Sequence, residues 1–97
     1  MLRYEFIGWC HDPKENHDKV WGVIRLDESF YGKILIFWGR RGKKLQTKLD
    51  HYSHKTSALI RMKEREYNYI NEARLESVYP EFRTDLEKTA VWAILSA

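Results

Sequence analysis

The stretch that decides the fold is residues 33–49, which read KILIFWGRRGKKLQTKL. Its first part, Lys33–Trp38, is a run of aliphatic and aromatic residues that favours a strand. Gly39 and Gly42 follow, and both allow the positive φ angles that a tight turn needs. The pattern of Leu45–Leu49 is compatible with a returning strand. The stretch therefore predicts two neighbouring antiparallel strands joined by a short basic turn.

Two further strands are predicted before this stretch. Side chains alternate between two faces from Leu2 to Cys10, which is typical of a strand. The segment Lys19–Leu26 is again rich in β-branched and aromatic residues. A polar loop, His11–Asp18, separates the two strands, and Asp27–Gly32 is expected to turn. Together the segments predict an antiparallel sheet of about four strands.

A change of period after His51 predicts a long helix from about Lys55 to Arg74. Its apolar residues recur at spacings of three and four, and we expect them to pack across the sheet. The other side of the helix is charged and is expected to face solvent. The packed side comprises Leu59, Met62, Glu66, Tyr69, Ile70 and Ala73, and the solvent side comprises Arg61, Lys63, Arg65, Asn68 and Glu72.

A short C-terminal helix is predicted after Pro80. Thr84 and Glu87 have the spacing of a capping box, so we expect this helix to begin there and to run to about Leu95. A chain of 97 residues buries one modest core, which predicts a single domain over residues 1–97. The fold class predicted is α+β, with the long helix across the sheet and the short helix completing the core.

Positive charge is concentrated in one segment. Residues 33–48 hold six basic residues and no acidic one, whereas residues 1–32 hold four basic and six acidic residues. Residues 49–97 are close to balance, with seven basic and eight acidic residues. Such clustering is typical of a surface that binds a polyanion, and equally of a solvated hairpin tip.

Several classes of protein are not expected. The single cysteine, Cys10, cannot form an intramolecular disulfide, and no apolar run approaches the roughly 20 residues of a membrane span, so we expect a cytoplasmic protein. The spacing of His51 and His54 is a weak metal signal, and Cys10 and His11 with His17 do not supply the paired ligands of structural zinc, so no metal is expected. We find no nucleophile with a positioned base and no phosphate-binding glycine loop, and therefore expect neither an enzyme nor a cofactor.

The segment Trp38-Gly39-Arg40, with Gly42 two positions later and Gln46 beyond it, resembles the signature of WGR domains. The preceding strand and the following helix are also similar to those of the family. The resemblance covers about residues 17–79, and the predicted helix at about 84–95 lies beyond it.

WGR domains occur in DNA-dependent poly(ADP-ribose) polymerases, where they bind DNA ends and touch neighbouring domains, and in small bacterial proteins. The resemblance therefore implies a non-catalytic module that binds the backbone or the ends of DNA with low sequence specificity. The alternative is a protein-interaction module that docks through the same turn. The expected binding residues are Trp38, Gly39, Arg40, Arg41, Lys43, Lys44, Gln46 and Lys48.

Two of these residues have a second, structural interpretation. The resemblance implies that Trp38 packs against a terminal sugar or base, but Trp38 also continues an apolar strand as a core residue would. It implies that Arg40 reaches a phosphate or an adjoining domain, but a guanidinium equally suits carbonyls of a turn. Asp18 stands where the family often has Asn, and a carboxylate there would repel phosphate.

Overall fold

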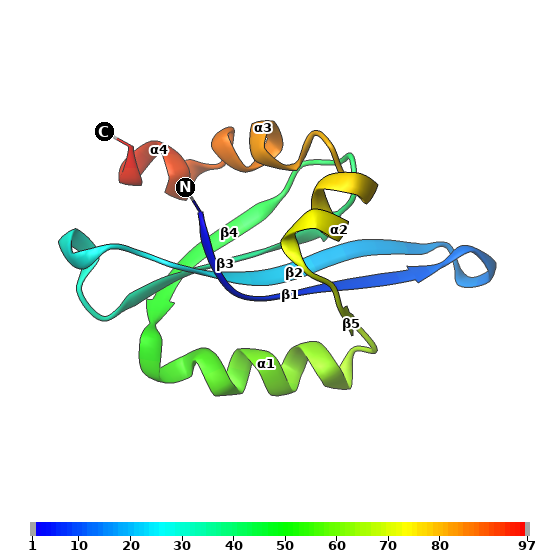
Figure 1. Cartoon of the computed structure of the whole chain (residues 1–97), viewed down its shortest axis with the longest axis horizontal. Coiled ribbons are helices and arrows are strands. Elements are labelled where there is room, and N and C mark those ends of the chain that lie inside the picture. The colour runs from blue at the N-terminus through cyan, green and yellow to red at the C-terminus, as the bar shows by residue number, and fades with distance from the viewer. Residues whose placement is uncertain (1, 97) are drawn as a thin grey trace.

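An antiparallel sheet of five strands forms the centre of the structure, in the order β4-β3-β2-β1-β5 (Figure 1). The computed structural model describes residues 2–96. The α+β class and the antiparallel sheet are confirmed, but the sheet has five strands where about four were predicted, the fifth being a short strand at the edge of β1. The strands are β1 (Arg3–Asp12), β2 (His17–Arg25), β3 (Lys33–Arg40), β4 (Gln46–His51) and β5 (Asn68–Tyr69).

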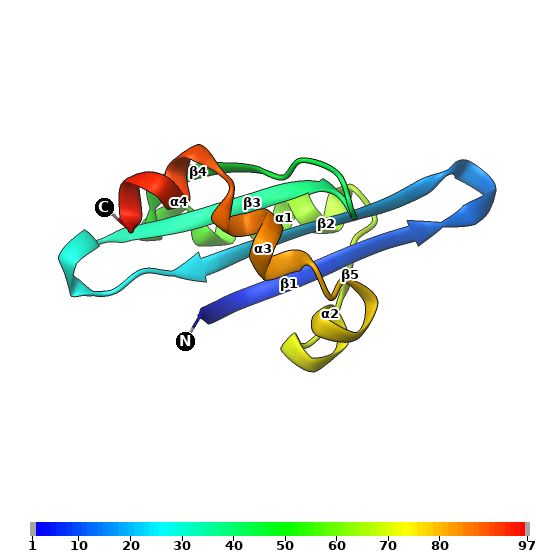
Figure 2. The same cartoon turned by 90° about the horizontal axis from the view of Figure 1, so that it is seen from above.

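Helices cover both faces of this sheet. Figures 1 and 2 show α1 below one face, α3 and α4 across the other, and α2 beside β1. Within residues 2–96, no helix is long and apolar enough to cross a membrane. The helices are α1 (Lys55–Glu64), α2 (Glu72–Val78), α3 (Phe82–Glu87) and α4 (Ala90–Leu95), with short 3-10 turns at Pro13–Glu15, Glu28–Phe30 and Tyr52–His54.

Because side chains of a strand alternate between its faces, the central strands bury residues on both sides. The face toward α1 holds a cluster of Cys10, Trp21, Val23, Ile34, Ile36, Ala58, Met62 and Tyr67. The opposite face holds a cluster of Ile7, Val20, Ile24, Leu35, Phe37, Leu45, Leu75, Tyr79, Phe82 and Leu86. Both clusters share the same sheet, so the chain folds as a single small domain.

The prediction of one helix from Lys55 to Arg74 is wrong. Helix α1 ends at Glu64, and Glu66 adopts a φ of 64°, which reverses the chain. Tyr67 is then buried beside Trp21, at a ring-centroid distance of 5.8 Å. The next two residues pair with β1 as β5, and the Asn71 side chain caps α2 by accepting from the Arg74 N–H at 2.7 Å. Packing of Tyr67 and pairing with β1 therefore override a weak helical period.

The predicted capping box at Thr84 and Glu87 is also wrong. Helix α3 begins at Phe82, and Thr84 lies inside it. Phe82 is buried against Phe37, with 4.8 Å between ring centroids, so this contact sets where the helix lies. A second helix follows as α4, with Thr89 at its N-cap. The C-terminal segment is therefore two short helices on the sheet and not one.

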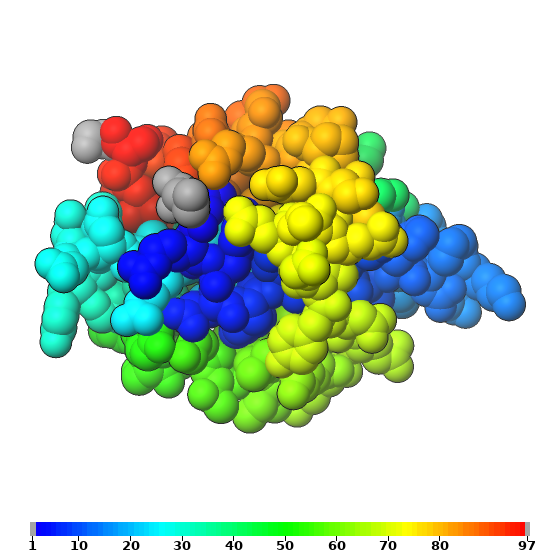
Figure 3. Space-filling model, viewed as in Figure 1, coloured from blue at the N-terminus to red at the C-terminus, as the bar shows by residue number. Residues whose placement is uncertain are grey.

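The hairpin of β1 and β2 is longer than its neighbours. Its tip projects from one end of the molecule, beyond the layers of helices (Figure 3). The loop between β3 and β4 lies at the same end, because β3 pairs with β2 up to Lys19 and Arg40. This end of the sheet carries Arg40, Arg41, Lys43 and Lys44 of the basic segment.

Candidate nucleic-acid interface

The loop between β3 and β4 contains the basic turn predicted from the sequence. Its two glycines have positive φ angles, 151° at Gly39 and 82° at Gly42, and the Lys43 N–H donates to the Arg40 carbonyl at 3.0 Å. Leu45 is 2% exposed and belongs to the core cluster beneath α3. A Cβ on Gly39 would lie 3.2 Å from the Leu45 side chain, so the loop folds closely over this residue.

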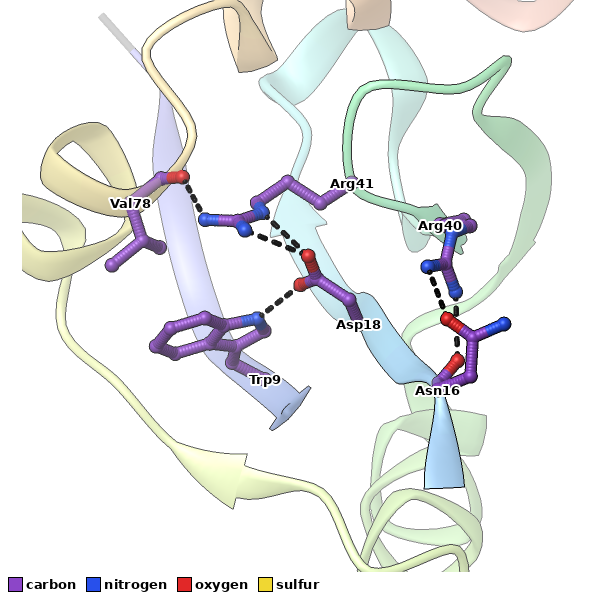
Figure 4. A network of polar contacts seen from close by, with 6 residues as sticks. All are labelled: Trp9, Asn16, Asp18, Arg40, Arg41 and Val78. Carbon is purple, nitrogen blue, oxygen red and sulfur yellow. Dashed lines mark hydrogen bonds and ion pairs between the residues drawn. The ribbon is translucent and has the colours of Figure 1, made fainter. Parts of the chain in front are cut away.

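Arg40 bridges this loop to the tip of the neighbouring hairpin. Its guanidinium donates to the Asn16 carbonyl at 2.9 Å and to the Asn16 Oδ1 at 3.0 Å (Figure 4). Asn16 is held in the left-handed region, with a φ of 56°. Arg40 thus bonds a turn carbonyl, which is one of the two roles that the sequence left open, and it remains exposed to solvent.

Arg41 is held inside a polar network and is not a free cation. Its guanidinium lies 2.7 Å from the Asp18 carboxylate and donates to the Val78 carbonyl at 2.6 Å (Figure 4). The Trp9 indole N–H donates to the other carboxylate oxygen of Asp18 at 2.9 Å. The network joins the ends of β1, β2 and β3 to α2. The charges of Arg41 and Asp18 offset each other, so neither residue adds to a polyanion surface.

Arg41→Ala is expected to destabilise the fold by about 1–3 kcal/mol, because it removes the guanidinium that donates to one oxygen of the partly buried Asp18 carboxylate and to the Val78 carbonyl. Urea unfolding monitored by tryptophan fluorescence measures this change. Lys43→Ala is the matched control, because it removes an exposed cation from the same loop, and should change stability by less than about 0.5 kcal/mol. Equal stability of the two variants would contradict the structural role of Arg41.

Trp38 lies in a groove between α1 and the β3–β4 pair. Its indole is half-buried and packs on Trp21, with 6.3 Å between the ring centroids. The groove has a volume of about 420 Å³. Trp38 is therefore both a packing residue of the α1 face and part of an open surface. The groove is lined by Trp21, Ile36, Trp38, Lys48, Asp50, His54, Ser57, Ala58, Arg61 and Arg65.

Arg61 of α1 and Arg65, the C-cap residue of that helix, line this groove, and both were predicted on the solvent side of a helix. Arg61 and Arg65 are exposed, and no carboxylate within residues 2–96 pairs with either of them. The Arg65 guanidinium lies 5.2 Å from the Trp21 ring, which is a cation–π contact that leaves its N–H groups free to donate. With Lys48 from β4, they place three cations around the two indoles. Arg61 and Arg65 are four residues apart, so they lie on the same side of a helix, and this spacing is the feature of the sequence that could have predicted their grouping.

One carboxylate, that of Asp50, also lines the groove. Its Oδ1 lies 2.7 Å from the His54 Nδ1 and accepts from the His51 N–H at 2.7 Å. Lys48 Nζ lies 3.7 Å from its Oδ2. Burial alone would raise the pKa of Asp50, but the hydrogen bonds from His54 and the His51 N–H outweigh it and lower that pKa. The groove therefore keeps one negative charge beside its cations at neutral pH.

The remaining predicted residues do not all lie beside Trp38. Gln46 lies opposite Trp38 in the β3–β4 pairing and is exposed. Lys43 and Lys44 line a different hollow, which also contains Lys88. The basic segment is thus divided into two surfaces, and the groove holds only Trp38 and Lys48 of the predicted set.

Within residues 2–96, no group of three or more His, Cys, Asp or Glu side chains is arranged to hold a metal ion. Comparison of the chain with protein-family models, with curated proteins and with solved structures finds no match.

Proposed function

We propose that this chain is a nucleic-acid-binding module that holds the sugar-phosphate backbone along the groove between α1 and β3–β4. The observation that carries this proposal is the grouping of three cations, Lys48, Arg61 and Arg65, around the half-buried Trp38. Phosphate is the ligand that suits two arginines without acidic partners, because the guanidinium forks donate to its oxygens in pairs. The ligand that the groove suits therefore carries phosphate groups.

The indoles distinguish nucleic acid from other polyanions. Aromatic side chains beside cations stack on sugars and bases of nucleic acids, which a purely charged polymer does not offer. Trp38 is the ring placed for this contact, because Trp21 lies behind it and is buried. A WGR-like assignment, suggested by the Trp38-Gly39-Arg40 segment, supports the same ligand. Phosphate contacts carry little base information, so sequence specificity is low.

Titration of a labelled DNA duplex with free ends, at about 50 mM and about 200 mM salt, tests the proposal. We expect dissociation constants of roughly 10⁻⁴ to 10⁻⁶ M at the higher salt, and tighter binding at the lower. Scrambling the base sequence should leave the affinity unchanged. An absence of binding at low salt would refute the proposal and would favour the protein-docking alternative.

Asp50→Asn is expected to raise the affinity for the duplex by about 2- to 5-fold, because it removes the one carboxylate of the groove. The amide oxygen of Asn can still accept from the His51 N–H, so the local fold should persist. Glu64→Gln is the matched control, since it removes an acid of α1 that does not line the groove. The same titration measures both variants, and an equal gain from the control would assign the effect to net charge alone.

A further inference from the structure

A second group of cations lies near the loop between β3 and β4. Lys43 and Lys44 of the loop, with Lys88 at the end of α3, line a hollow of about 430 Å³, named here the lysine hollow. None of the three pairs with a carboxylate within residues 2–96. The acidic residue in the lining, Asp85, accepts a hydrogen bond from the Tyr79 hydroxyl. The lysine hollow therefore has a net positive charge.

The lysine hollow and the Trp38 groove lie on opposite faces of the β3–β4 hairpin. Strand alternation places Trp38 on the face toward α1, whereas Phe37 belongs to the core beneath α3. Leu45 is buried in that same core. The loop therefore lies close to the C-terminal helices, and Lys43 and Lys44 lie near Lys88. The two cationic surfaces are thus separated by the hairpin, and the loop is the edge between them.

We infer that the lysine hollow is a second phosphate-binding surface, and that one nucleic-acid molecule contacts the hollow and the groove together around this edge. The inference rests on the proposed function of the groove. A strand of DNA carries one phosphate per roughly 3.4 Å, so a polymer supplies phosphates to both surfaces, whereas a single nucleotide fills one. Through Lys88, the C-terminal helices would then contact nucleic acid as well as pack on the sheet.

The variant that isolates the lysine hollow is Lys88→Glu in the full chain, because Lys88 lines the hollow and not the groove. Its affinity for the duplex should fall by about 3- to 10-fold, and the slope of log affinity against log salt should shrink by about one. Arg83→Glu is the matched control, since it reverses an exposed cation of α3 outside the hollow. It should leave both quantities unchanged.

A second variant separates this inference from the proposed function. Arg61→Glu with Arg65→Glu reverses charges of the groove alone. Losses of affinity in this variant and in Lys88→Glu support contact with both surfaces. A loss only in the groove variant overturns the inference and leaves the proposed function standing, whereas a loss only in Lys88→Glu overturns both the groove proposal and the two-sided contact. No loss in either variant refutes the proposed function.

Discussion

Reversal of both groove arginines, Arg61→Glu with Arg65→Glu, is expected to lower the affinity for a DNA duplex by about 10- to 100-fold at low salt. Both arginines line the groove together with the two indoles, and neither has an acidic partner among the described residues. The salt slope should shrink by about two, because two phosphate contacts are lost. Fluorescence anisotropy at several salt concentrations measures both quantities.

A single reversal on the same helix provides the control for net charge. Lys63 is exposed on α1 but lies over the Tyr69 ring, at 5.4 Å, and not in the groove. Lys63→Glu should therefore bind the duplex within about twofold of the parent chain, whereas Arg61→Glu alone should bind clearly more weakly. Similar losses in both would mean that binding follows overall charge and that the groove is not the site. Thermal unfolding of each variant excludes loss of fold as the cause.

Phe82→Ala is expected to lower the free energy of unfolding by about 3–5 kcal/mol. Phe82 is 4% exposed and its ring packs against Phe37, Tyr79 and Tyr4, at centroid distances of 4.8, 5.6 and 6.3 Å. Truncation removes these contacts and leaves a cavity between α3 and the sheet. Because small domains have about 5–15 kcal/mol of stability in total, the loss should be visible as a large shift of the urea midpoint.

The control for Phe82→Ala is Ile94→Ala on α4, whose side chain is 64% exposed. It should change stability by less than about 0.5 kcal/mol. If Phe82→Ala also cost less than about 1 kcal/mol, the C-terminal helices would not be part of the core. Core packing would then be confined to the sheet, α1 and α2.

The strands could be predicted because their signal is local. Alternation in β1 and the apolar runs of β2 and β3 follow from burial of one or both faces of the sheet. The helix boundaries were harder to predict from the sequence, since the end of α1 depends on the positive φ of Glu66 and on the burial of Tyr67 beneath the sheet. A short strand of two residues, β5, leaves almost no periodic signal of its own.

The candidate site was predictable only in part. Trp38 could be named from the resemblance of its segment to WGR domains and Lys48 from the charge count, and both line the groove. Arg41 was counted as a free cation because its partner, Asp18, is distant in the sequence. Arg61 was predicted on the solvent side of a helix and is exposed, but the helical period does not reveal that it also lines a groove beside the sheet. These assignments depend on contacts between distant segments, which composition does not reveal.

Binding at the groove can be observed directly through the indole N–H resonances of the four tryptophans. Trp38 and Trp21 line the groove, whereas Trp9 lies in the Asp18 network and Trp92 lies on α4. Titration of an unlabelled DNA duplex into the ¹⁵N-labelled chain should shift the Trp38 resonance most and Trp21 next, with Trp9 and Trp92 nearly unchanged. A Trp38 resonance that stays in place while the protein binds the duplex would contradict the proposed function.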